Sequence, residues 1–154
     1  MVDWGVLEEL EAQEARLVFR RFDNDTAIAL GTALLTAARD RGLPIVVSVR
    51  RGQQRLFHAA LPGTSADNDD WIDRKSRVVD RYGRSSLRVR ETFAARGREF
   101  PLDPALYAAF GGVFPIIVEN VGPVGTVGVS GLPHTEDHAF VVERLEAFLE
   151  RGGR

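Results

Sequence analysis

The sequence contains no cysteine. Disulfide bonds, thiolate catalysis and metal centres with cysteine ligands are therefore excluded. Lysine is almost absent as well, because 19 of the 20 basic residues are arginine and Lys75 is the only lysine. A single lysine in a chain that otherwise uses arginine makes Lys75 the first candidate for a special role.

The sequence also lacks an excess of either charge and any long apolar run. Its 20 basic and 22 acidic residues leave a formal net charge of −2, which gives no electrostatic reason to bind nucleic acid or anionic lipid. No apolar run approaches the ~18 residues of a membrane-spanning helix, and the N-terminal stretch is acidic and amphipathic. We therefore expect no nucleic-acid partner, no membrane association and a cytoplasmic location.

The length and the hydrophobic pattern predict one α+β domain spanning residues 1–154. Two hairpins imply antiparallel pairing, and the helices around them imply a layer packed on the sheet. A helix starting at Asp103-Pro104 is expected to carry Leu106, Tyr107 and Phe110. Three other helices are predicted at 3–14, 67–82 and 134–150. Two more begin at caps: one runs from Asp23 or Asn24 to Gly42 with Ile28 in its apolar stripe, and one runs from Ser85 or Ser86 to about Ala95. The predicted strands are 17–19, 44–49, 53–61, 113–119 and 124–130.

Lys75 lies within an apolar stripe if residues 67–82 are helical, because Asn68, Trp71 and Ile72 share its face. One interpretation buries the stem of Lys75 and leaves its ammonium group in water. The other has Lys75 and Arg74 bind a carboxylate, such as that of a small organic acid or a haem propionate. A role as an imine-forming residue would require a pKa lowered by burial.

The helix start and the neighbouring hairpin offer further candidates. Asp67 and Asn68 suit a helix cap as well as a binding site. In the second strand of the first hairpin, alternation places His58 on one face and Phe57 on the other. His58 is therefore either a hydrogen-bonded core or interface residue, or part of a cleft between sheet and helix.

Two histidines are spaced four residues apart on the last predicted helix, and both face its apolar stripe. His134 and His138 could share a metal or ligate haem iron, with Asp137 orienting one ring. Alternatively, the acidic residues favour the helix N-terminus and His138 is a hydrogen-bonded boundary residue. No zinc-protease, phosphate-loop, dinucleotide or nucleophile-elbow motif is present.

Six blocks along the chain resemble the haem-degrading domain family (GlcG-like), and more narrowly its branch catalogued as an uncharacterised protein family. The blocks are FDNDTAIALG, GQQRLFHAALPGT, DNDDWIDRKSRVV, RYGRSS, GGVFPI and VSGLPHTEDH. The resemblance implies a profilin-like fold, in which an antiparallel sheet of two hairpins and a short strand is flanked by helices, and a homo-oligomer of two or more subunits. The candidate ligand-binding residues are Phe57, His58, Asp67, Asn68, Trp71, Arg74, Lys75, Ser85, Ser86, Gly112, Asp137 and His138.

These observations favour a non-catalytic module that binds a small organic anion or a protein partner, because groups suited to acid, base or nucleophilic chemistry are scattered over separate elements. The first alternative is a haem-binding or haem-degrading protein, with His138, His134 or His58 on the iron and Arg74 or Lys75 on the propionates. The second alternative is an oligomeric structural protein that uses residues 67–82 as a subunit interface. No catalytic residue is assigned, and the question of enzymatic activity stays open.

Overall fold

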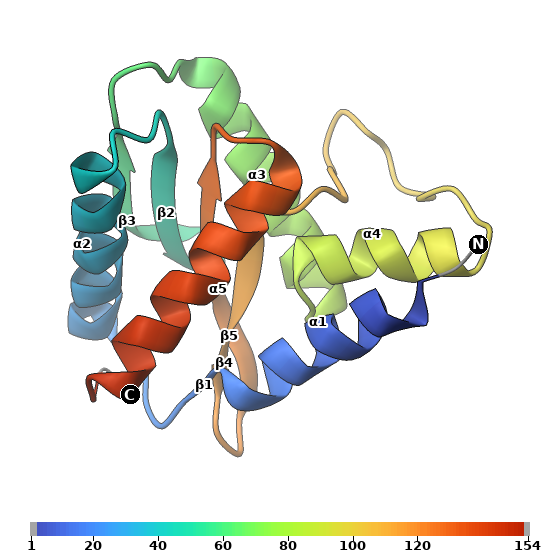
Figure 1. Ribbon diagram of the computed structural model, residues 1–154, viewed down its shortest axis with the longest axis horizontal. Helices are drawn as coiled ribbons and strands as arrows, with labels where there is room; N and C mark the ends of the chain where they lie inside the picture. Colours follow the sequence, from blue (N-terminus) through green and yellow to red (C-terminus); the bar gives the residue numbers. More distant parts are fainter. Residues whose placement is uncertain (1–2, 153–154) are drawn as a thin grey trace.

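The computed structural model describes residues 3–152. Five strands form one sheet in the order β1–β4–β5–β2–β3 (Figure 1). The hairpins β2–β3 and β4–β5 join through antiparallel pairing of β2 with β5, whereas β1 pairs with β4 in parallel. The α+β class is confirmed, and the sheet is mixed rather than fully antiparallel. The strands are Val18–Phe19 (β1), Val46–Arg51 (β2), Gln54–Ala60 (β3), Val113–Val118 (β4) and Gly122–Ser130 (β5).

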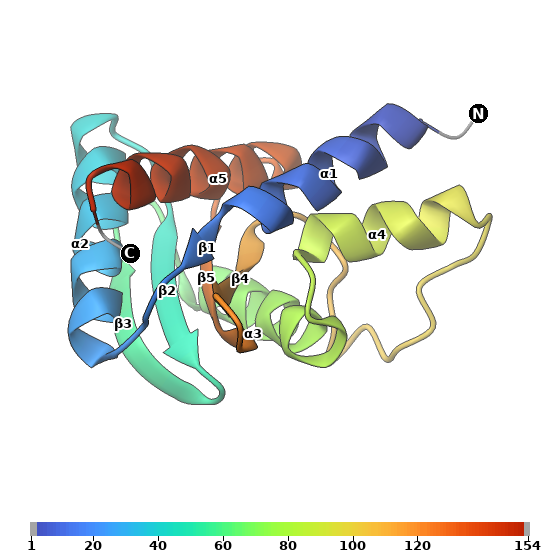
Figure 2. The ribbon, with the colours of Figure 1, turned by 90° about the horizontal axis from the view of Figure 1, so that it is seen from below.

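Helices cover both faces of the sheet. Figures 1 and 2 show α2 and α5 on one face and α3 on the other, with α1 and α4 beside each other at one end. The main apolar core lies between the sheet and the α2–α5 layer, and Val47 and Val49 of β2 and Val127 and Val129 of β5 belong to it. The helices are Trp4–Arg16 (α1), Asn24–Asp40 (α2), Ala66–Tyr82 (α3), Ser86–Ala95 (α4) and His134–Glu150 (α5).

The predicted stripe of α2 is largely confirmed, with one error. Asp23 caps the helix by accepting a hydrogen bond from the backbone of Thr26, and Leu30 and Leu34 are fully buried. Ile28 is 49% exposed, because Ala27 takes the inward position in that turn. Ile28 is therefore a surface residue and not part of the core.

Local capping sets the position of α3. The Ser65 hydroxyl caps the first turn, and the side-chain oxygen of Asn68 accepts a hydrogen bond from the Ser65 N–H in a capping box. Gly83 ends the helix in the left-handed conformation, with φ of 68°. These two ends hold Asn68, Trp71 and Lys75 in register against the sheet.

The helix predicted at Asp103 is wrong. Asp103 begins a turn by accepting hydrogen bonds from the N–H groups of Leu106 and Tyr107. The next donor, the N–H of Ala108, bonds to the carbonyl of Arg74 on α3 instead of continuing the turn. The chain therefore stays irregular from the end of α4 to β4. Within residues 3–152, no helix has the length and apolarity needed to cross a membrane.

Candidate ligand-binding site

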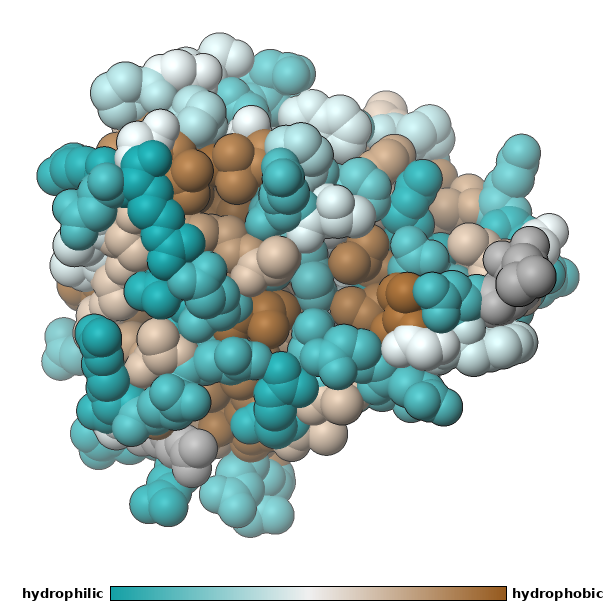
Figure 3. All heavy atoms as spheres, viewed as in Figure 1, coloured by the Kyte–Doolittle hydropathy of each residue, from teal (hydrophilic) through white to brown (hydrophobic). Residues whose placement is uncertain are grey.

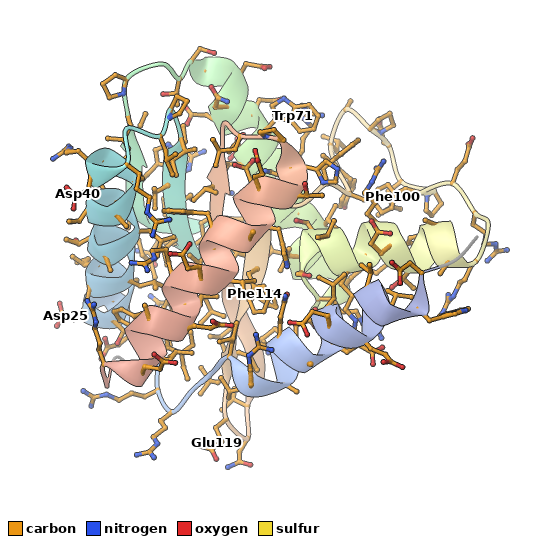
Figure 4. The ribbon with its side chains drawn as sticks, in the orientation of Figure 1. Asp25, Asp40, Trp71, Phe100, Phe114 and Glu119 are labelled. Carbon is orange, nitrogen blue, oxygen red and sulfur yellow. The ribbon has the colours of Figure 1, made fainter. Side chains whose placement is uncertain are left out.

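A cavity of about 250 Å³ opens between the first half of α3, the end of β5 and the start of α5. Figure 4 shows Trp71 on α3 near the start of α5, where it forms part of the cavity wall. The cavity brings together residues from three separate parts of the sequence. Its lining residues are Asp67, Asn68, Trp71, Lys75, Phe110, Ser130, Gly131, Leu132, His134 and Asp137.

Lys75 lies at the base of this cavity and is only 2% exposed. Its Nζ donates hydrogen bonds to the carbonyl oxygens of Val129 at 3.0 Å and Gly111 at 3.1 Å, and lies 3.5 Å from Oδ2 of Asp137. Gly112, with φ of +132°, makes room for the ammonium group, because a Cβ at that position would collide with Nζ. The interpretation that places the ammonium of Lys75 in bulk water is therefore wrong.

Burial shifts both members of the Lys75–Asp137 pair towards their neutral forms. Desolvation lowers the pKa of Lys75, and the nearby Asp137 carboxylate opposes this shift. Desolvation also raises the pKa of Asp137 to about 6, against the pull of Lys75 and of the backbone N–H groups of Leu132 and Gly131. Burial therefore favours the neutral form of each group, whereas the attraction between the two charged forms opposes both shifts.

Several hydrogen-bond donors on the cavity wall have no partner among residues 3–152. The Ser130 hydroxyl belongs to a residue that is 4% exposed, and it makes no hydrogen bond within that range. The oxygen of Asn68 is used by Ser65, which leaves the amide nitrogen unpaired. His134 accepts a hydrogen bond from the Gly111 N–H at Nδ1, so its proton lies on Nε2. The indole N–H of Trp71 is also unpaired in the described part of the chain.

His134 is neutral at pH 7, because desolvation lowers its pKa and the positive charges of Arg90 and Lys75 lower it further. Its ring packs edge-on against Phe110 at 5.3 Å, and Phe110 packs edge-on against Trp71 at 5.6 Å. Arg90 lies over the Phe110 ring at 4.3 Å. This aromatic wall supplies apolar contact area next to the unpaired donors.

The other histidine of α5 points elsewhere. His138 Nε2 lies 2.8 Å from Oε1 of Gln13 on α1, and its ring packs near Phe114, which Figure 4 labels at the centre of the sheet. Desolvation lowers the pKa of His138 to about 4. Residues 3–152 contain no group of three or more potential metal-binding side chains. His134 lines the cavity, whereas His138 bonds to Gln13 through Nε2 and keeps a buried Nδ1 without a partner among residues 3–152, so the two rings do not converge on one metal.

The hairpin candidates lie outside the cavity. His58 Nε2 is 2.9 Å from Oδ1 of Asp69 at the start of α3. Phe57 is on the opposite face of the sheet, packed so closely on Gly31 of α2 that a Cβ on Gly31 would collide with its ring. His58, Lys75 and His138 therefore do not share one cavity.

The serine candidates have structural contacts at the far end of α3. Ser85 caps α4 through the backbone of Arg88. The hydroxyl of Ser86 donates to the carbonyl of Val113 and accepts from its N–H, both at 3.2 Å.

The sequence candidates that line the cavity are Asp67, Asn68, Trp71, Lys75, His134 and Asp137. Gly112 borders Lys75, and Arg74 lies over the indole ring of Trp71 at 4.1 Å. Ligand binding by these residues stays a prediction.

Four lining residues were not among the candidate binding residues of the sequence analysis: Phe110, Ser130, Gly131 and Leu132. Alternation along β5 could have identified Ser130, because it places Ser130 on the opposite face of the strand from the apolar Val127 and Val129. Those two valines face the main core. Ser130 must therefore face α3, on the side where Lys75 lies.

Comparison with known proteins gives the family. The family model described as haem degrading protein HbpS-like matches residues 22–146. A UPF0303 protein from Streptomyces avermitilis is 58% identical over 149 residues, covering 94% of this chain and 91% of the relative. The crystal structure of Ybr137w protein is similar with a TM-score of 0.84 and 31% identity, covering 94% of this chain and 88% of that chain.

A more distant likeness extends the fold comparison. The crystal structure of a PduOC:Heme complex has a TM-score of 0.69 at 15% identity, covering 82% of this chain and 94% of that chain. At this identity the likeness shows a common fold alone. The family model and the close relatives confirm the resemblance carried by the sequence blocks. The chain belongs to the HbpS-like haem-degrading protein family, and within it to the uncharacterised UPF0303 proteins.

Proposed function

We propose that this chain is a non-catalytic binding module that holds a small organic anion in the cavity between α3 and α5. The observation that carries the proposal is the set of donors on the cavity wall, from Ser130, Asn68 and His134, that have no partner among residues 3–152. A ligand rich in acceptor oxygens, such as a carboxylate, would satisfy Ser130, Asn68 and His134 together.

Helix dipoles support the same ligand class. The N-terminal turns of α3 and α5 both contribute to the cavity wall, through Asn68 and His134. The positive end of a helix favours an anion. At about 250 Å³ the cavity is smaller than the roughly 300–1,000 Å³ of pockets for drug-sized ligands, so the anion must be small.

Ser130→Ala tests this proposal. We expect the variant to bind small carboxylates at least roughly tenfold more weakly, because a hydrogen bond to a charged group contributes about 1.5–3 kcal/mol. A thermal-shift panel of small mono- and dicarboxylates would identify a ligand, and calorimetry would then compare the variants. Thr126→Ala is the matched control, because Thr126 is equally buried on β5 but does not line the cavity. Equal affinity of wild type and Ser130→Ala for every ligand found would refute the site.

Haem is the second candidate, supported by the family's description as haem degrading and by the haem in the PduOC complex. The residues present do not fit a haem enclosed in this cavity. The volume is below that of drug-sized pockets, and His138 Nε2 is bound to Gln13. His134 is the one histidine within residues 3–152 that lines the cavity.

Hemin titration separates the two candidates. If the anion proposal is correct, added hemin will give no saturable Soret shift that depends on His134. A shift that His134→Ala abolishes and His138→Ala retains would establish haem at this cavity instead. A shift lost only in His138→Ala would place haem on the α1 side of α5.

We also propose that the chain forms a homo-oligomer through the outer end of its sheet. β3 is an edge strand, since β2 is its one partner among the described strands. An unpaired edge is a ready template for a second chain. The neighbouring α2 carries the exposed Ile28, which adds apolar area beside that edge.

A further inference from the structure

We propose that the ligand of the α3–α5 cavity carries a carbonyl group next to its carboxylate, and that Lys75 captures it covalently as an imine. This inference rests on the proposed anion site, because the same donors would hold the carboxylate. Lys75 is the only lysine of the chain and lies at the base of that cavity. Asp137, the one acidic side chain bonded to it, lines the same cavity.

The hydrogen bonds of the Lys75 Nζ leave one side of the nitrogen free to react. The two shorter bonds go to the backbone carbonyls of Val129 and Gly111, which belong to the β5 strand and the chain entering β4. The longest contact, at 3.5 Å, goes to Asp137 on the cavity wall. A neutral amine has two N–H groups and one lone pair. Its N–H groups would keep the two carbonyls, so the lone pair would take the side facing Asp137 and the cavity.

Burial prepares this pair for proton exchange. Desolvation lowers the pKa of Lys75 and raises that of Asp137, so the neutral amine is accessible at lower pH than for a lysine in water. A lysine desolvated in an apolar pocket is a common way to obtain a nucleophilic amine. The carboxyl of Asp137 is placed to take the proton and to return it.

The atoms and charges of the step balance without a redox partner. The Lys75 ammonium first gives a proton to the Asp137 carboxylate. The nitrogen lone pair then forms a bond to the carbonyl carbon as the C=O π bond breaks, and a proton moves from nitrogen to that oxygen to give a carbinolamine. The nitrogen next forms a double bond to the carbon while the C–O bond breaks, and Asp137 protonates the departing hydroxyl. The products are one water, a protonated imine and the Asp137 carboxylate that faces it.

The cavity restricts the ligand to small oxo acids. Ser130 and Asn68 come from different walls and supply donors for a carboxylate, and the neutral His134 supplies a third. Trp71 and Phe110 form an apolar wall that limits water near the new bond. A volume of about 250 Å³ leaves room for an acid of a few carbon atoms.

Reductive trapping tests the inference directly. Full-length protein would be incubated with pyruvate and sodium cyanoborohydride, and the adduct located by peptide mapping. We expect the peptide that contains Lys75 to be modified to saturation, and faster than the N-terminal α-amine in the same sample. Modification of the α-amine with Lys75 left intact would overturn the inference. Because the chain has one lysine, wild-type protein alone decides this outcome.

Two variants separate this inference from the anion site. Asp137→Asn should slow trapping about 100-fold, since a positioned acid–base group contributes roughly 10²–10⁴-fold, while Thr126→Ala should have no effect. A folded Asp137→Asn that traps at the wild-type rate would contradict the assigned role of Asp137. Carboxylate binding that depends on Ser130 without any trapping at Lys75 would leave the proposed function intact and refute the imine. Trapping that is insensitive to Ser130→Ala, together with unchanged carboxylate binding, would refute the anion site itself.

Discussion

Two neighbouring residues of α5, Asp137 and His138, make opposite contributions to stability as pH changes. The folded-state pKa of Asp137, about 6, lies above its ordinary 3.8, so its contribution is complete below pH 3.8 and is lost as pH rises through about 6. The folded-state pKa of His138, about 4, lies below its ordinary 6.5, so its contribution is complete above pH 6.5 and is lost as pH falls towards 4. Between pH 4 and 6 the two effects oppose each other.

Replacing His138 would uncover this compensation. Glutamine keeps a hydrogen-bonding group towards Gln13 and does not titrate. We expect the stability advantage of wild type over His138→Gln to shrink by about 3 kcal/mol as pH falls from 6.5 to 4, at ~1.4 kcal/mol for each pKa unit. Urea unfolding at several pH values in this window measures the difference. An advantage that stays constant with pH would show that His138 does not titrate differently in the folded and unfolded chains.

At the residue scale, the sequence predicts which face of a helix carries a side chain, but not which groups that side chain will contact. Helical spacing correctly placed Lys75 on the inner face of α3, and it placed His138 on the inner face of α5. The acceptors around Lys75 lie 36, 54 and 62 positions away, and Gln13 lies 125 positions from His138. Periodicity within one helix contains no information about such distant groups. The interpretation that left the ammonium of Lys75 in water was wrong for this reason.

At the scale of elements, the irregular segment before β4 shows why local signals can be overruled. Asp103-Pro104 has the chemistry of a helix start, and one turn does form there. Arginine side chains then bind the carbonyls of the following residues. Arg77 Nη1 donates to Leu106 at 3.0 Å, and Arg90 Nη1 lies 3.4 Å from the Ala109 carbonyl. These bonds satisfy backbone groups that a helix would otherwise have satisfied, which keeps Phe110 at the cavity.

Some of the strand pairs could likewise be predicted from the sequence, and one could not. Both hairpins could be predicted from sequence, because each combines two β-rich runs with a short turn. The parallel pairing of β1 with β4 joins segments about 100 residues apart, such as Val18 and Ile117, so no turn chemistry signals it. The mixed sheet could therefore be found only from the tertiary arrangement.

At the scale of the whole molecule, the surface determines whether the protein is a monomer or an oligomer. In Figure 3 apolar residues form separate patches among hydrophilic ones on the face covered by α2 and α5. We expect wild type to elute above its monomer mass of 17.0 kDa in sizing chromatography with light scattering. Ile28→Glu should reduce that mass, because a charge would be buried beside the β3 edge.

Leu106→Glu is the matched control, since Leu106 is 48% exposed like Ile28 but lies in the irregular segment before β4. A wild-type mass equal to that of one chain would contradict the homo-oligomer. A lower mass for Leu106→Glu with no change for Ile28→Glu would move the interface away from β3.

Because the only lysine is buried, chemical labelling of that lysine reports the opening of the folded structure. Acylating reagents too bulky for the cavity find no lysine on the folded surface, because Lys75 is enclosed by α3, β5 and α5. Each lysine they modify marks a molecule in which these elements have separated. The rate at which the Lys75 peptide is labelled therefore measures how often the protein leaves the native state, with no engineered probe and no second lysine to subtract.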